Sequence, residues 1–136
     1  MRRPRIPRPI TGRRYTDGRH SWRYDRGVSA SVPLREPTFL ILAALGPGPL
    51  HGYGVIKAVE EMSQGRVRLR AGTLYGALER LEADGLVAFD GEVSDGGPPR
   101  RNYRLTNTGA DLLAQEAARL RANADLAVAR LGLRGT

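Results

Sequence analysis

The amino-acid sequence predicts a mainly α-helical protein of the α+β class, with a small β-hairpin and a long C-terminal helix. Apolar residues recur at helical spacing in three short segments before residue 85, and apolar strand-like runs at 86–89 and 103–105 flank a turn rich in Gly and Pro. A further helical pattern runs without a break from Thr106 to about Leu131. Three short helices followed by a hairpin are the layout of a winged helix-turn-helix.

The basic charge of the chain is concentrated at its N-terminus. The 136 residues carry a formal net charge of +8, but residues 1–34 hold nine Arg against two Asp, which leaves a net charge of only +1 for residues 35–136. Pro and Gly interrupt this arm and no hydrophobic period is present, so we expect it to be disordered. The folded part is then a winged helix-turn-helix domain at 35–105 and a dimerisation helix at 106–136.

The composition excludes several classes of function. The chain has no Cys and only two His, far apart in sequence, which argues against a disulfide scaffold, thiol catalysis or a metal site. It also lacks a phosphate-binding loop and a nucleophile elbow, so we expect no enzyme, no catalytic residue and no cofactor. The longest apolar run, 39–45, is too short to span a membrane, and we expect a soluble, cytoplasmic protein with no membrane partner.

The predicted elements follow from local patterns. A helix is expected over 38–45 with Pro37 in its first turn, and the Gly/Pro-rich segment 46–50 ends it as a loop. A second helix is expected over 53–62. The strict alternation at 66–70 predicts a short strand. A third helix is predicted over about 72–84, and Thr106 is a suitable N-cap for the last helix.

The third helix is the candidate recognition helix, which in a winged helix-turn-helix enters the major groove of DNA. At about 100° per residue, its large apolar side chains share the face directed at the core. A helix that lies in a groove needs small residues for close approach and donors that reach bases or phosphates. The outward or flanking residues that meet these needs are Gly72, Thr73, Tyr75, Gly76 and Arg80. An ordinary core helix would show the same apolar pattern.

Other basic residues are placed where this layout needs them. Lys57 is on the polar side of the second helix, and Arg100 and Arg101 lie beside the hairpin turn, where a wing contacts a phosphate or the minor groove. Three more basic residues share one face of the segment just before the third helix: Arg66, Arg68 and Arg70.

Three segments together closely resemble the PadR family of transcriptional regulators. They are Gly48-Pro49-Leu50-His51-Gly52-Tyr53-Gly54-Val55-Ile56-Lys57, then Gly72-Thr73-Leu74-Tyr75-Gly76-Ala77-Leu78-Glu79-Arg80-Leu81-Glu82, then Gly85-Leu86 with Arg100-Arg101-Asn102-Tyr103-Arg104-Leu105-Thr106. Their order and spacing are those of the family, over roughly residues 34–131, and the combination of the first two segments is specific.

The resemblance implies a homodimeric winged-helix repressor that responds to a small hydrophobic or phenolic effector. It places Thr73, Tyr75 and Arg80 on the recognition helix. It places Tyr53 and Lys57 on the supporting helix, and Arg100, Arg101 and Tyr103 on the wing. The chain departs from the family pattern near Pro98 and at Asn102, in the absence of an aromatic residue from the C-terminal helix, and throughout the arm.

The last helix predicts a homodimer independently of the resemblance. Its small and apolar residues recur at alternating spacings of four and three, the pattern of a coiled-coil seam. The seam consists of Leu113, Ala117, Leu120, Ala124, Ala127 and Leu131. Packing of this stripe on the chain's own domain is the alternative. A two-fold dimer would bind a pseudo-palindromic operator in double-stranded DNA.

Three other interpretations remain open from the sequence. The near-neutral residues 35–136 suit a winged-helix module that binds a protein instead of DNA. In the arm, residues 1–34, Arg residues alternate with three aromatics, which suits a non-specific nucleic-acid binder that supplies all the affinity. Alternatively, the arm is a non-functional leader that results from a start codon placed too far upstream.

Overall fold

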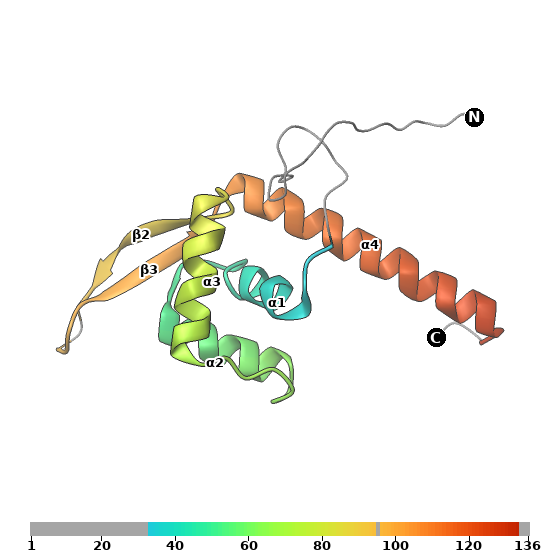
Figure 1. Cartoon of the computed structure of the whole chain (residues 1–136), viewed down its shortest axis with the longest axis horizontal. Coiled ribbons are helices and arrows are strands. Elements are labelled where there is room, and N and C mark those ends of the chain that lie inside the picture. The colour runs from blue at the N-terminus through green and yellow to red at the C-terminus, as the bar shows by residue number, and fades with distance from the viewer. Residues whose placement is uncertain (1–32, 95, 134–136) are drawn as a thin grey trace. The chain divides into compact units, whose positions relative to one another are not determined.

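The structure is a computed structural model that describes residues 33–94 and 96–133 (Figure 1). Within these residues the elements are α1 (Glu36–Ala44), β1 (Leu50–His51), α2 (Gly52–Met62), α3 (Ala71–Ala83), β2 (Val87–Val93), β3 (Arg100–Leu105) and α4 (Asn107–Leu131). The predicted α+β class, with a hairpin and a long C-terminal helix, is confirmed. Of the predicted arm, residues 1–34, only Pro33 and Leu34 lie among the described residues. Leu34 packs against the core, so the folded part begins at least one residue earlier than predicted.

The strands form one antiparallel sheet in the order β1-β3-β2. Tyr103 of the central strand β3 pairs with Leu50 of β1 on one side and with Phe89 of β2 on the other. A register shift between Phe89 and Glu92 marks a bulge in β2. Beyond the bulge, β2 and β3 run together away from the helices as the wing (Figure 1).

The core is formed by one side of each short helix and by the start of β2. Ile41 and Leu42 of α1, Val55 and Val59 of α2, and Leu74 and Leu78 of α3 are all at most 1% exposed. Leu86 and Val87 close this core beneath the wing. Burial of apolar surface on this scale is the main force that holds three such short helices in place.

The helix boundaries lie within two residues of those predicted. Glu36 and Pro37 form the first turn of α1, which starts earlier than expected because both residue types favour a helix N-terminus. The N-cap of α4 is Thr106 as predicted, because its Oγ1 accepts a hydrogen bond of 3.0 Å from the Gly109 N–H. α2 begins at Gly52, directly after a cap that the sequence did not suggest, His51.

The predicted strand at 66–70 is wrong. The segment is extended but pairs with no strand, and it is held instead by Ser63, whose Oγ accepts a 2.9 Å hydrogen bond from the Val67 N–H. Val67 and Leu69 pack against the core while the three Arg between and around them are exposed. The alternation of the sequence therefore reflects an inside–outside pattern in an isolated extended segment. The strand that completes the three-stranded sheet is β1, at the end of the segment that was expected to be a loop.

The hairpin is joined to α4 by a single residue, Thr106. Its Oγ1 donates to the Gly85 carbonyl at 2.7 Å, and its N–H donates to the Leu86 carbonyl at 3.1 Å. In the first turn of α4, Gly109 lies so close to Leu86 that a Cβ atom would overlap the Leu86 carbonyl and approach Leu105 Cδ1 to 2.9 Å. Only glycine fits here, so the start of α4 is pressed directly onto the backbone at the base of the wing.

Candidate nucleic-acid interface

The exposed face of α3 carries the side chains predicted for recognition. Thr73, Tyr75 and Arg80 are exposed, whereas Leu74, Ala77, Leu78 and Leu81 on the other face are buried, so the predicted division of the helix is correct. Gly72 and Gly76 leave this face without a side chain at two points. Without side chains at these two points, DNA can approach the backbone of α3 closely, and polar side chains lie on both sides of the gap.

Arg80 extends back along this face toward the N-terminus of α3. Its Nη1 lies 3.8 Å from the place that a Cβ on Gly76 would occupy. Long helical side chains take this direction because their Cα–Cβ bonds tilt toward the helix N-terminus. The charge of Arg80 is thus brought over Gly76, one turn before its own Cα, and into the middle of the exposed surface.

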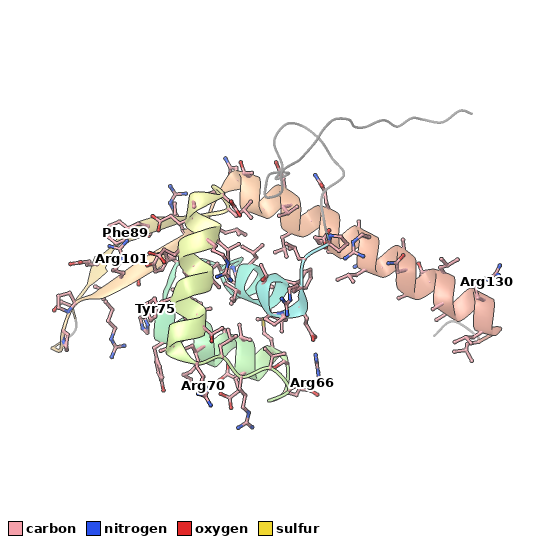
Figure 2. The ribbon with its side chains drawn as sticks, viewed as in Figure 1. Arg66, Arg70, Tyr75, Phe89, Arg101 and Arg130 are labelled. Atoms are coloured by element: carbon pink, nitrogen blue, oxygen red, sulfur yellow. The ribbon has the colours of Figure 1, made fainter. Side chains whose placement is uncertain are left out.

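Tyr75 connects α3 to the start of α2. A Cβ atom on Gly52 would overlap the phenol of Tyr75 and approach its Cε1 to 2.9 Å, so the ring lies directly against the α2 backbone. The ring is nevertheless 46% exposed. Figure 2 shows Tyr75 at the side of α3 that faces the wing and the start of α2. Glycine at position 52 therefore determines where the ring of Tyr75 is held.

The supporting helix α2 presents Tyr53 and, one turn later, Lys57, both exposed. The rings of His51 and Tyr53 are nearly parallel, with centroids 6.3 Å apart and an interplanar angle of 13°. His51 caps α2, since its Nδ1 accepts a 3.1 Å hydrogen bond from the Gly54 N–H. Both predicted residues of α2 therefore lie on its outer surface, next to a capping histidine.

The three basic residues before α3 are not equivalent. Arg66 makes two hydrogen bonds to the carboxylate of Glu36, of 2.9 and 2.7 Å, which raise the pKa of the guanidinium and lower that of Glu36. Arg68 donates to the Gly65 carbonyl at 3.1 Å and lies 3.7 Å from a carboxylate oxygen of Glu60. Arg70 has no ion pair among the described residues. Within the part of the chain that the structure describes, Arg66 and Arg68 each lie beside a carboxylate, whereas Arg70 does not.

Arg100 and Arg101 of the wing point to opposite faces of β3, as consecutive residues of a strand must. The guanidinium of Arg101 lies 4.1 Å from the ring centroid of Phe89, and its Nε donates to the hydroxyl of Tyr103 at 3.2 Å, which raises the pKa of Arg101. Tyr103 itself is only 6% exposed. Its ring belongs to the core, and its hydroxyl accepts the hydrogen bond that positions Arg101.

Arg100, on the other face, approaches the start of α2. Its Nη1 lies 3.3 Å from Nε2 of His51. The pairing of His51 with Asn102 across β1 and β3 brings the two side chains to the same face of the sheet. His51 was not among the predicted site residues. The sequence held no clear local signal for it, because His is not among the residues that N-cap positions favour.

The predicted dimer seam on α4 is exposed along most of its length in the single chain. Leu113 packs against the core, but Leu120 is 44% and Leu131 is 71% exposed, and the intervening alanines are exposed as well. Nearer its start, α4 is fixed to the domain by Glu116. This buried carboxylate accepts from the Leu34 N–H at 2.9 Å and from Arg119 at 2.8 Å.

A sequence comparison assigns the domain. Residues 41–115, more than half of the chain, match the sequence model of the Transcriptional regulator PadR-like family. The chain belongs to the PadR-like family. This confirms the resemblance noted in the sequence, and the family is one of transcriptional regulators, not of enzymes.

Curated relatives of this PadR-like protein are longer than the shared region. An uncharacterised 37.1 kDa protein in transposon TN4556 of Streptomyces fradiae is 46% identical over 82 residues, or 60% of this chain and 22% of that protein. Transcriptional regulator Rv3488 of Mycobacterium tuberculosis is 44% identical over 57 residues, or 42% of this chain and 52% of that protein. The chain thus spans about half or less of the length of these relatives.

Solved structures of PadR-like proteins share the fold. A PadR family regulator from Clostridium difficile is 27% identical with a TM-score of 0.60, over 70% of this chain and 97% of that chain. One from Eggerthella lenta is 31% identical with a TM-score of 0.56, over 69% and 79%. Bacillus subtilis PadR, solved in complex with operator DNA, is 24% identical with a TM-score of 0.54, over 61% and 47%.

Two further properties bear on the classes of function considered above. Within residues 33–94 and 96–133, no three His, Asp or Glu side chains gather closely enough to hold a metal ion. In the same part of the chain, no helix combines the length and the apolar character that crossing a membrane requires.

Proposed function

We propose that this PadR-like protein is a sequence-specific DNA-binding transcriptional regulator. In this proposal α3 lies in the major groove, with Thr73, Tyr75 and Arg80 toward the bases or phosphates and the wing along the backbone. The observation that carries the proposal is the exposed face of α3, where the Arg80 guanidinium lies over Gly76. The operator complex of the structurally similar Bacillus subtilis PadR supports this choice of partner.

The domain's small net charge is compatible with this partner. Part of its basic charge is neutralised within the domain, as in the Arg66–Glu36 pair, whereas Lys57, Arg70 and Arg80 form no ion pair among the described residues. Binding would then depend on a few placed cations, not on a general basic field. A regulator of chromosomal genes that binds in this way works in the cytoplasm.

The test is duplex binding by the full chain and by Arg80→Ala, with Arg121→Ala as the matched control on an exposed position of α4. A duplex that the wild-type protein selects from a random pool should bind far more tightly than a scrambled duplex, and its affinity should fall steeply with salt. Loss of the Arg80 contact should weaken binding by about 1–3 kcal/mol without unfolding the domain. Equal affinity for selected and scrambled duplexes would refute sequence-specific binding.

The same assay separates the alternative functions. If the arm supplies the affinity, replacing the nine Arg of residues 1–34 by Gln abolishes binding to every duplex and Arg80→Ala has no effect. If the domain is a protein-interaction module and the arm is inert, neither the wild-type chain nor the arm-neutralised chain binds any duplex, but both still self-associate.

We infer further that the protein is a homodimer formed through α4, which would bind a pseudo-palindrome with half-sites about one helical turn apart. The exposed leucines of α4 support a partner helix, since a solvent-exposed stripe of this kind gains stability by burial. Light scattering should give twice the 14.9 kDa chain mass, and Leu120→Glu combined with Leu131→Glu should give the monomer. A monomeric wild-type protein would refute the dimer.

Repression, with release by a small hydrophobic or phenolic effector, completes the proposal and rests on the family resemblance. α4 contains no aromatic residue, so an effector bound there would pack against Leu and Ala instead of stacking on a ring. Transcription in vitro from a promoter that carries the selected duplex should decrease when the protein is added. An increase would show an activator.

A further inference from the structure

The cap of α2 fixes the chemistry of the His51 ring. Nδ1 accepts from the Gly54 N–H at 3.1 Å, in a geometry set by the extended backbone of His51 and the first turn of the helix. A ring nitrogen that accepts a hydrogen bond carries no hydrogen. The neutral imidazole therefore carries its hydrogen at Nε2, which makes Nε2 a donor.

The group next to His51 Nε2 is a second donor, the guanidinium of Arg100. Its Nη1 is 3.3 Å from His51 Nε2, and a guanidinium has no acceptor. The contact is therefore not a hydrogen bond between the two residues. The backbone imposes it, since the pairing of His51 with Asn102 places the side chains of His51 and Arg100 on one face of the sheet.

The two groups lack a shared acceptor within the described residues. Arg104, on the same face of β3, is paired with Asp90 at 3.4 Å, whereas Arg100 forms no ion pair among the residues that the structure describes. An oxygen at an ordinary hydrogen-bond distance of about 2.9 Å from each nitrogen fits a donor separation of 3.3 Å. A negatively charged acceptor would satisfy both donors and offset the charge of Arg100.

The pair lies next to the candidate recognition surface. His51 is adjacent to Gly52, against which the ring of Tyr75 from α3 is held, and its ring is stacked on that of exposed Tyr53. A duplex whose major groove holds α3 would bring a strand of its backbone to this edge of the helix, between α3 and the wing.

We propose that His51 and Arg100 together bind one backbone phosphate of the DNA and so join α2 to the wing on the duplex. This inference rests on the proposed function, since it assigns two contacts of the same interface. It gives His51 two simultaneous roles: Nδ1 caps the helix, and that cap directs the Nε2 hydrogen toward the phosphate. Arg100 supplies the charge.

His51→Ser separates these roles. Ser is a good N-cap and can accept from the Gly54 N–H, but it has no donor that reaches the phosphate position beside Arg100. The variant should keep the melting temperature of the wild-type chain and bind the selected duplex roughly 5- to 30-fold more weakly per half-site. Because the proposal assigns the charge of this contact to Arg100, His51→Ser should leave the salt slope unchanged, whereas Arg100→Gln should reduce that slope by about 1 per half-site.

Duplexes with single uncharged methylphosphonate linkages identify the contact. A methylphosphonate at one particular position in each half-site should weaken binding of the wild-type chain. His51→Ser and Arg100→Gln should both be insensitive to a methylphosphonate at that same position. Arg130→Gln, an equal change of charge near the end of α4 (Figure 2), should keep it. The double variant should lose less than the product of the two single losses, because both act on one phosphate.

The outcomes are distinguishable. If the wild-type chain shows no preference for any duplex, the proposed function fails and this inference fails with it. If the wild-type chain binds specifically but His51→Ser binds equally well, or if the two variants lose sensitivity at different phosphates, the inference alone is overturned. A long-range ¹H–¹⁵N spectrum that placed the hydrogen of neutral His51 on Nδ1 would also overturn it. Inorganic phosphate exchanged for chloride at constant ionic strength should not displace the duplex; displacement would show a site for the free ion instead.

Discussion

Replacing Gly52 by Ala should impair DNA binding without unfolding the protein. The new Cβ would lie 2.5 Å from Tyr75 Cζ, whereas ordinary contacts are about 3.5–4.0 Å, so the ring must move by at least about 1 Å. The atoms displaced belong to the far end of a side chain that is already half exposed, and rotation about χ1 or χ2 can relieve the overlap. The folded domain therefore remains accessible to the variant, with Tyr75 in a different place.

The expected stability change is small. Ala at a helix start with an ordinary backbone conformation reduces the entropy of the unfolded chain, which offsets part of the cost of moving the ring. The free energy of unfolding should stay within about 1 kcal/mol of wild type, as measured by urea denaturation. Duplex affinity should fall by about 1–2 kcal/mol, or 5- to 30-fold, through the loss of the Tyr75 contact.

Two variants make this result interpretable. Gly48→Ala introduces the same methyl group where nothing lies within 4 Å, and it should change neither quantity. Gly52→Ala and Tyr75→Ala should be non-additive in affinity, since the first acts through the second. If Gly52→Ala left affinity unchanged while Tyr75→Ala weakened it, the ring's position against α2 would be irrelevant to binding. A loss of stability above about 3 kcal/mol would show that the backbone yields instead of the ring.

Three further changes test other parts of the structure. Gly109→Ala should destabilise the domain by about 3 kcal/mol or more, because its Cβ meets the Leu86 carbonyl and backbone cannot swing aside; a melting temperature equal to wild type would refute this contact. Glu116→Gln should cost about 1–3 kcal/mol near neutral pH through the weakened bond from Arg119. That bond lowers the pKa of Glu116 in the folded state, so the carboxylate's contribution is complete above the unfolded pKa near 4.3 and is lost as pH falls through the lower folded value; a stability difference between the two chains that persisted unchanged to pH 2 would contradict it. Finally, Arg66→Gln should affect duplex affinity less than Arg70→Gln, since Glu36 already engages Arg66; equal losses in a duplex titration would show that this ion pair opens on DNA.

The faces of the helices could be predicted because helical periodicity records burial directly. The buried positions of α3 and the exposed ones, including Arg80, follow from 100° per residue alone. Thr106 was recognisable as a cap because its residue type and its position before an apolar repeat are local signals.

Features that depend on distant partners were not accessible in this way. The alternation at 66–70 carries the same signal whether or not another strand is adjacent, and β1, with only two residues, is too short to show any period. The pairing of Arg66 with Glu36 joins residues thirty positions apart, and nothing local distinguishes a paired arginine from a free one. That Arg100 and Arg101 would face opposite ways follows from strand geometry, but the partners they meet do not.

The single-residue connection at Thr106 has a mechanical consequence. Three hydrogen bonds of Thr106 and the close packing of Gly109 on Leu86 hold the start of α4 against the base of the wing. We therefore expect α4 and the wing to rotate together as one rigid body. The seven residues of β2 extend about 23 Å from the connection at Thr106. A rotation of α4 by about 10° would therefore move the tip of the wing by about 4 Å. That displacement exceeds the length of a hydrogen bond. In the proposed dimer on DNA, a small change in the crossing of the two α4 helices would thus be enough to take both wings off the phosphates that they are proposed to contact.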